Sequence, residues 1–115
     1  MKILNKTQNT ILASKAAVAK FFYQRMKGLL GRRSLSRGEA LIIPRCQCIH
    51  MFFMRFGIDV LFIDKYENVV GLVEKIKPFQ ISPFFRKASY AIEGAEGMIK
   101  ESQTQQGDQI KILEP

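Results

Sequence analysis

The sequence predicts an α+β fold in which mostly antiparallel strands form a curled sheet or small β-barrel with one principal helix, about residues 14–28. Two observations predict this class. Short segments rich in β-branched and aromatic residues recur from residue 40 onward, separated by Gly, Pro and polar turns. An earlier stretch instead repeats its apolar residues at helical spacing. The 115 residues contain no internal repeat or long linker, so we expect a single domain over residues 1–115.

The first expected elements are a strand pair and the helix. The segments KILN (2–5) and TILA (10–13) flank the polar stretch NKTQN, whose Asn and Lys residues suit a chain reversal. Ser14 is then a suitable N-cap for the run KAAVAKFFYQRMKGLL. This run places four apolar residues on one helical face: Val18, Phe22, Met26 and Leu29. Gly28 and Gly31 mark the helix end, so the helix should cover the core with its basic residues outside.

Strands dominate after residue 40. The predicted segments are ALII (40–43), CIHMFFM (48–54), IDVLFID (58–64), VVGLVEKI (69–76), ASYAIE (88–93) and QIKIL (109–113). The clearest hairpin spans residues 58–76, because two apolar runs flank the turn DKYEN. Apolar residues occupy both strand parities in this hairpin, which predicts that its strands are central and covered on both faces.

Charge is distributed unevenly along the chain. The net charge is +8; residues 1–57 carry 11 Lys or Arg and one acid, Glu39, whereas residues 58–115 carry 7 Lys or Arg and 9 acids. A cationic face would attract a polyanion such as nucleic acid, anionic lipid or an acidic protein, although high net charge also simply aids solubility. No helix-turn-helix, Gly-rich phosphate loop or RNA-recognition signature is legible, so nucleic acid is not the favoured partner.

The sequence gives no signal for export or membrane insertion. Its N-terminus lacks an uninterrupted apolar core of 7 residues, and the longest apolar region, 56–63, is far too short to span a bilayer. We therefore expect a cytoplasmic protein, with a processed exported form as the alternative. Cys46 and Cys48 lie only two positions apart and cannot staple distant segments, so free thiols are expected.

The chain's single histidine lies beside both cysteines in PRCQCIHMFFMRFGIDVLFIDK (44–65). On a strand, Cys46, His50 and Met54 would share a face, which invites a metal site. However, Cys46 and His50 would lie about 13 Å apart on a strand, too far to share an ion. We expect no metal and no cofactor. Catalysis by a Cys46 thiolate with His50 as its base stays an alternative, although the spacing suits it poorly without a bulge.

Asp59 lies inside the apolar run FGIDVLFI and must therefore be either paired or exposed at a strand start. It could cap the turn at Gly57 or form a structural pair with an arginine. Alternatively, His50, Arg55, Asp59 and Glu93 could be the few polar groups that converge on an apolar pocket, as in many small-molecule sites.

Several motifs resemble one known family. IHMFFMRFGIDVLFIDK is similar to the hallmark I-H-T-F-F-M-R-F-P-I-D-V-x-F-L-D of domain of unknown function 192. AKFFYQRMKGLLGRRSLSRGEALII resembles the R-x-x-G-L-M-G-R and G-E-G-L-L segments of that family, and Cys46 matches a cysteine common four residues before the histidine. AIEGAEGMIKESQTQQGDQIKI resembles its closing L-E-L-P-A-G and G-D pattern. The similarity runs from about residue 12 to the end.

The resemblance implies a compact α+β fold with mixed β-barrel character and no established activity. This chain departs from the hallmark at two positions. Met51 stands where a threonine is usual, and Gly57 stands where a proline is usual. The loss of a hydroxyl beside His50 weakens the case for a polar site, and glycine loosens the turn that places Asp59.

Three functions are open at this point. The leading hypothesis is a non-catalytic binding domain for a small polar or anionic ligand, with a pocket framed by Arg32, His50, Met54, Arg55, Asp59 and Glu93. The second is an interaction module that binds a polyanion through the basic helix and the loop GRRSLSRG (31–38). The third is an enzyme that uses Cys46 and His50, or Asp59 and Glu93, as catalytic groups.

Overall fold

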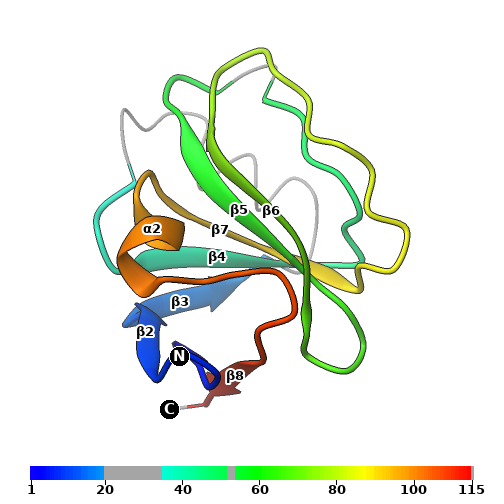
Figure 1. Ribbon diagram of the computed structural model, residues 1–115. Helices are drawn as coiled ribbons and strands as arrows, with labels where there is room; N and C mark the ends of the chain where they lie inside the picture. Colours follow the sequence, from blue (N-terminus) through cyan, green and yellow to red (C-terminus); the bar gives the residue numbers. More distant parts are fainter. Residues whose placement is uncertain (20–34, 52–53, 115) are drawn as a thin grey trace.

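A computed structural model describes residues 1–19, 35–51 and 54–114, which form two sheets and one short helix (Figure 1). In chain order the elements are β1 (Lys2–Asn5), β2 (Thr10–Ala13), β3 (Lys15–Val18), β4 (Glu39–Pro44), β5 (Ile58–Ile63), β6 (Val69–Ile76), β7 (Tyr90–Ala95), α2 (Met98–Ser102) and β8 (Ile110–Leu113). The larger sheet has the order β3-β4-β7-β5-β6 and the smaller β2-β1-β8. All pairs are antiparallel except β3 with β4.

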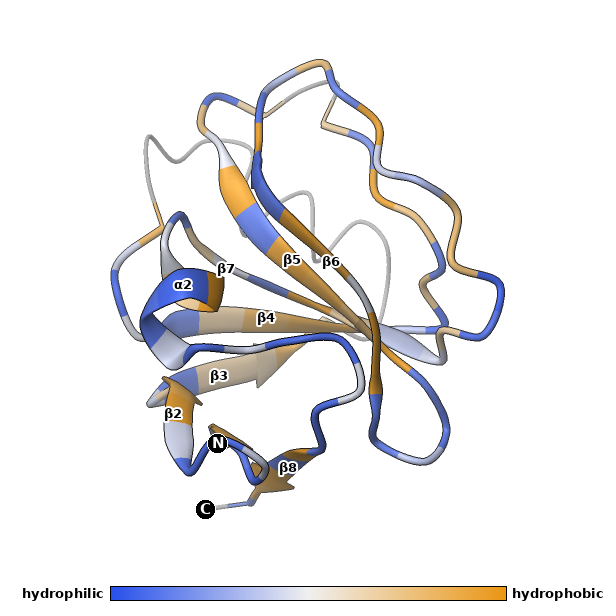
Figure 2. Ribbon diagram, viewed as in Figure 1, coloured by the Kyte–Doolittle hydropathy of each residue, from blue (hydrophilic) through white to orange (hydrophobic). Residues whose placement is uncertain are grey.

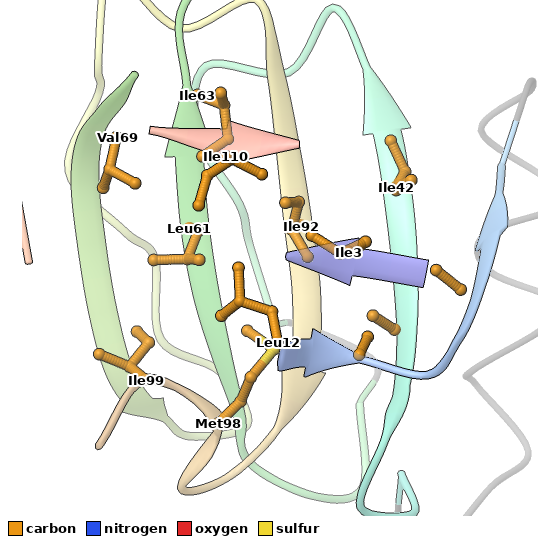
Figure 3. Packing of buried hydrophobic residues seen from close by; sticks show 13 residues of the cluster. Ile3, Leu12, Ile42, Leu61, Ile63, Val69, Ile92, Met98, Ile99 and Ile110 are labelled. Atoms are coloured by element: carbon orange, nitrogen blue, oxygen red, sulfur yellow. The ribbon is translucent and has the colours of Figure 1, made fainter. Parts of the chain in front are cut away.

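The five-stranded sheet is the middle layer of the molecule. Figure 3 shows that the small sheet and α2 cover one of its faces, with a cluster that includes Ile3, Leu61, Ile92 and Ile110 between them. A second cluster lies on the opposite face and includes Ile49, Met51, Val60 and Phe62. Successive β5 residues face alternate clusters, so every residue of this strand is buried.

Most predicted strands are confirmed, and so is the hairpin of β5 with β6. The expected coverage on both faces holds for β5, which lies between β6 and β7, whereas β6 is an edge strand. Hydropathy along the ribbon follows this arrangement: β5 is apolar except for one hydrophilic band near its start, at Asp59, whereas β6 becomes hydrophilic near its end at Glu74 and Lys75 (Figure 2).

The prediction of a helix over residues 14–28 is wrong at its start. Lys15–Val18 is strand β3, which runs parallel to β4, and the N–H groups of Ser14 and Lys15 both donate to the Gly38 carbonyl. Pairing with a distant strand therefore overrides the local helical spacing. Residues 20–28 of the predicted helix lie outside the described residues.

Two further expectations need correction. The predicted strand at 48–54 is absent from its described part, where only His50 pairs, in an isolated bridge with Ile81. The strands of the described segments also form two separate sheets, and no closed barrel is found among them. Within the same segments, no helix is long and apolar enough to cross a membrane.

A buried polar network joins the N-terminal hairpin to the segment after α2. The Asn5 amide donates to Thr104 Oγ1 and to Asp108 Oδ2, both at 3.0 Å. Asp108 Oδ2 also accepts bonds from Gln8 Nε2 at 3.0 Å and from the Gln105 N–H at 2.9 Å. Burial by itself would raise the pKa of Asp108, but the hydrogen bonds from Asn5, Gln105 and Gln8 outweigh it and lower the pKa.

This network predicts a pH-dependent contribution to stability. Because the folded-state pKa of Asp108 lies below its unfolded value, its stabilisation is complete above about pH 5 and is lost as pH falls through the folded pKa. We expect Asp108→Asn to lower the free energy of unfolding by about 1–3 kcal/mol at neutral pH. The difference from the parent protein should shrink at about pH 3, when measured by urea denaturation.

The control is Glu114→Gln, which removes an acid at an exposed position after β8. It should leave the unfolding free energy nearly unchanged at both pH values. A deficit of Asp108→Asn that is equal at both pH values would show that the carboxylate charge is not the source of the stabilisation.

Candidate functional site

Asp59 is fully buried near the start of β5, where it binds backbone groups of two other elements. Its Oδ1 accepts the N–H of Lys75 at 2.8 Å, and its Oδ2 accepts the N–H groups of Gly97 at 3.1 Å and Ile99 at 2.9 Å. Lys75 has a φ of 53° beside the register shift between β5 and β6, and Gly97 is the N-cap of α2. The carboxylate therefore accepts hydrogen bonds from backbone N–H groups that have no partner in regular strand pairing.

Glu93 is also fully buried, but it faces the other side of the sheet. It lies on β7 directly opposite Val60, a member of the second cluster, whereas Asp59 lies opposite Gly94. Neighbouring pairs on antiparallel strands point to opposite faces. The five-stranded sheet therefore separates the two carboxylates.

Two irregular segments lie side by side over the second cluster; we call them the paired loops (Figure 1). One consists of the described residues 45–51 and 54–57, and the other of residues 77–88. Met51 donates its N–H to the Gln80 carbonyl at 2.9 Å and accepts the Phe79 N–H at 2.8 Å. Ile49 exchanges bonds with Ser82, through the Ser82 N–H at 2.8 Å and Ser82 Oγ at 2.9 Å. These bonds fix one loop on the other.

Phe85 anchors the paired loops to the sheet. Its ring packs against Phe62 with centroids 4.5 Å apart. It also covers Gly71, where an added Cβ would lie 2.3 Å from the ring. Only glycine at position 71 allows this close approach, so the loops are held by a specific contact as well as by hydrogen bonds.

The outer side of the paired loops carries exposed apolar side chains. Phe79 is 74%, Ile81 60% and Phe84 64% exposed. Phe79 has a φ of 67° and is the third residue of a turn in which the Gln80 N–H donates to the Lys77 carbonyl at 3.1 Å. This position strongly favours glycine or asparagine, so a bulky residue here is strained.

The paired loops are basic throughout. They contain no Asp or Glu, and their exposed cations are Arg45, Arg55, Lys77, Arg86 and Lys87. Lys77 bonds Glu96 Oε1 at 2.8 Å, so its charge is compensated within the protein. In chain order the exposed apolar residues lie between Lys77 on one side and Arg86 and Lys87 on the other.

The structure distributes the sequence-predicted site residues among different environments. His50 and Arg55 lie on the paired loops, and His50 shares its face with Ile81 because the two form a β-bridge. Met54 is buried beneath the loops. The half-buried Cys46 donates its Sγ–H to the Cys48 carbonyl at 3.3 Å. Arg32 lies outside the described residues.

A cleft of about 640 Å³ lies elsewhere, and its lining includes none of the described residues named in the preceding paragraph. Its walls come from β2, the turn at Arg37–Glu39 and the stretch from Ala95 to Glu101. An ion pair at 3.0 Å joins Arg37 Nε to Glu101 Oε2 across two of these walls. The sequence offered no signal for this cleft, because its lining comes from three distant segments. In the portion of the chain that the structure describes, no three His, Cys, Asp or Glu residues are grouped to hold a metal ion.

Comparison with known proteins identifies the family. The profile of DUF192, described as "Uncharacterized ACR, COG1430", matches residues 3–112. The chain therefore belongs to the DUF192 family. This confirms the resemblance found in the hallmark stretch. UPF0127 proteins of Pyrococcus horikoshii and Pyrococcus abyssi are 33% and 32% identical to it over 95% and 96% of this chain, and over 96% and 97% of their own lengths.

The fold is shared with a solved structure. A crystal structure of a protein of unknown function from Novosphingobium aromaticivorans superposes with a TM-score of 0.81 at 17% identity, covering 97% of this chain and 84% of that one. Within the DUF192 hallmark, this structure separates two kinds of residue. Asp59 points inward and bonds backbone groups, whereas His50 and Arg55 belong to the outer loops.

The contacts of Asp59 predict a specific stability loss. Asn at position 59 replaces one acceptor oxygen by a donor, which would face backbone N–H groups. We expect Asp59→Asn to lower the free energy of unfolding by about 1–3 kcal/mol, measured by chemical denaturation.

The matched control is Asp64→Asn in the turn after β5. Asp64 Oδ1 accepts two backbone N–H groups at 2.9 Å, but it lies at a half-buried position. Its substitution should destabilise the protein less, because water can replace the lost bonds. Equal losses in the two variants would contradict a special role for the buried carboxylate.

Proposed function

We propose that this DUF192 protein is a non-catalytic interaction module that binds an anionic partner through the outer side of the paired loops. The observation that carries the proposal is the surface composition. Three exposed apolar side chains lie between cations on two adjacent segments that contain no acid. Such a surface combines apolar contact area with a field that attracts anions.

The fixed geometry of the loops supports a binding role. Hydrogen bonds between the loops and the packing of Phe85 on Phe62 hold the surface in one conformation. Binding through a rigid surface costs less conformational entropy than binding that must first order flexible loops. The strained turn at Phe79 is consistent with this, because strain that persists at an exposed residue points to function.

A surface is favoured over a pocket built on His50, Arg55 and Asp59. Both Asp59 oxygens already accept backbone hydrogen bonds on the opposite side of the sheet, so only the exposed Arg55 and the half-buried His50 remain from that group. An enzyme that uses Asp59 and Glu93 together is disfavoured for a related reason. Acid and base catalysts must both reach one substrate, and these carboxylates lie on opposite faces of the sheet.

The proposal is tested by retention on immobilised heparin, used as a model polyanion, at increasing salt. We expect the protein to elute above physiological ionic strength. The double variant Arg86→Gln/Lys87→Gln should elute clearly earlier, because two contacts to the polyanion are removed.

The matched control is Lys6→Gln/Lys111→Gln, which removes the same net charge at exposed positions near the termini. It should elute close to the parent protein. An equal shift in both double variants would mean that retention follows net charge alone, and the proposed surface would be rejected.

A further inference from the structure

We propose that the anionic partner is the surface of a lipid bilayer, on which the paired loops dock with Phe79, Ile81 and Phe84 entering the interfacial region. This inference rests on the proposed function and names the partner class. Figure 1 shows the 77–88 segment at the outer edge of the molecule, well away from both chain termini. The loops can therefore reach a flat surface without interference from the small sheet.

The chemistry of the exposed side chains favours a bilayer over nucleic acid. Phe79, Ile81 and Phe84 carry no hydrogen-bonding side-chain group, so they cannot read base edges. Platforms for single-stranded nucleic acid rely on aromatic rings that stack on bases, and the central member of this set is an isoleucine. A bilayer interface accepts aromatic and aliphatic side chains alike.

The arrangement of charges fits the same partner. Arg86 and Lys87 follow the apolar residues directly, and Arg45 reaches the same end of the loops because its N–H donates to the Ser89 carbonyl at 2.7 Å. Arg55 follows the paired stretch at its other end, because the loops pair from Gln47 with Phe85 to Met51 with Phe79. Cations on both sides of an apolar centre would contact anionic headgroups while the apolar side chains insert. Each such cation is expected to raise the affinity for an anionic surface by about fivefold.

Exposed apolar residues elsewhere provide a matched comparison. Ile81 is 60% exposed on the paired loops, and Ile11 is 62% exposed on β2 in the small sheet. The two positions carry the same side chain at nearly equal exposure but lie in different layers. If a substitution weakens vesicle binding at Ile81 but not at Ile11, the loss therefore reflects the location of the side chain and not its hydrophobicity.

The test is cosedimentation of the full chain with vesicles of phosphatidylcholine mixed with phosphatidylglycerol, compared with phosphatidylcholine alone. We expect binding to the mixed vesicles and weak binding to the neutral ones. Ile81→Ser should weaken the partition coefficient by about tenfold, whereas Ile11→Ser should leave it unchanged.

Fluorescence gives an independent reading of insertion. The sequence contains no tryptophan, so Phe84→Trp introduces a single reporter. Its emission should shift to the blue when mixed vesicles are added, because the indole leaves water. The matched reporter Ile11→Trp should show no shift. Loss of sedimentation in Ile81→Ser with an unchanged melting temperature excludes misfolding as the cause.

The other outcomes separate this inference from the proposed function. Salt-dependent heparin retention through Arg86 and Lys87 without vesicle binding would overturn the bilayer and leave the anion-binding surface standing. Quenching of Phe84→Trp by a single-stranded oligonucleotide, with no vesicle shift, would assign a nucleic acid partner instead. A dimer in light scattering that Ile81→Ser dissociates would assign the patch to a second copy of the chain. Failure of both heparin retention and vesicle binding would overturn both proposals.

Discussion

The architecture depends on one buried carboxylate. Asp59 lies in the one strand of the large sheet that is buried along its whole length, where an uncompensated charge would be strongly unfavourable. Three backbone N–H groups compensate it, and each belongs to a place where regular structure fails: the irregularity of β6 at Lys75 and the start of α2 at Gly97 and Ile99. One side chain thus satisfies donors from two elements and fixes both against β5, so the irregular backbone and the buried charge stabilise each other.

The same central strand explains why residues that are close together in the hallmark motif lie in different layers of the fold. His50 and Asp59 are nine positions apart, yet His50 lies on the paired loops and Asp59 faces the cluster beneath the small sheet. The turn before β5 carries the chain from the outer layer into the middle one. Before this turn, exposed residues such as Arg55 can reach a partner, although Met51 and Met54 belong to the core, whereas every residue of β5 is buried in the fold.

The sequence was sufficient for features that depend on local pattern. Alternation and turn residues located most strands and the hairpin of β5 with β6. The sequence was insufficient where pairing between distant segments determines the local structure. Lys15–Val18 begins a stretch with helical spacing but joins β4 as a parallel strand. The N–H groups at the start of α2 bind Asp59, which lies far from α2 in the sequence. The separation of Asp59 from Glu93 depends on the register of β5 with β7, and nothing in either segment alone records that register.

Phe79 is the point at which local preference and the observed structure disagree most. It is the one aromatic residue with positive φ among those that the structure describes, and its ring is largely exposed. The hydrogen bonds of this turn use backbone groups and the Gln80 side chain, so none of them depends on the Phe79 ring. Glycine would form the same bonds without strain. A large apolar ring at this position therefore makes physical sense if it is buried when the paired loops meet a partner, which relates the strained turn to binding and not to folding.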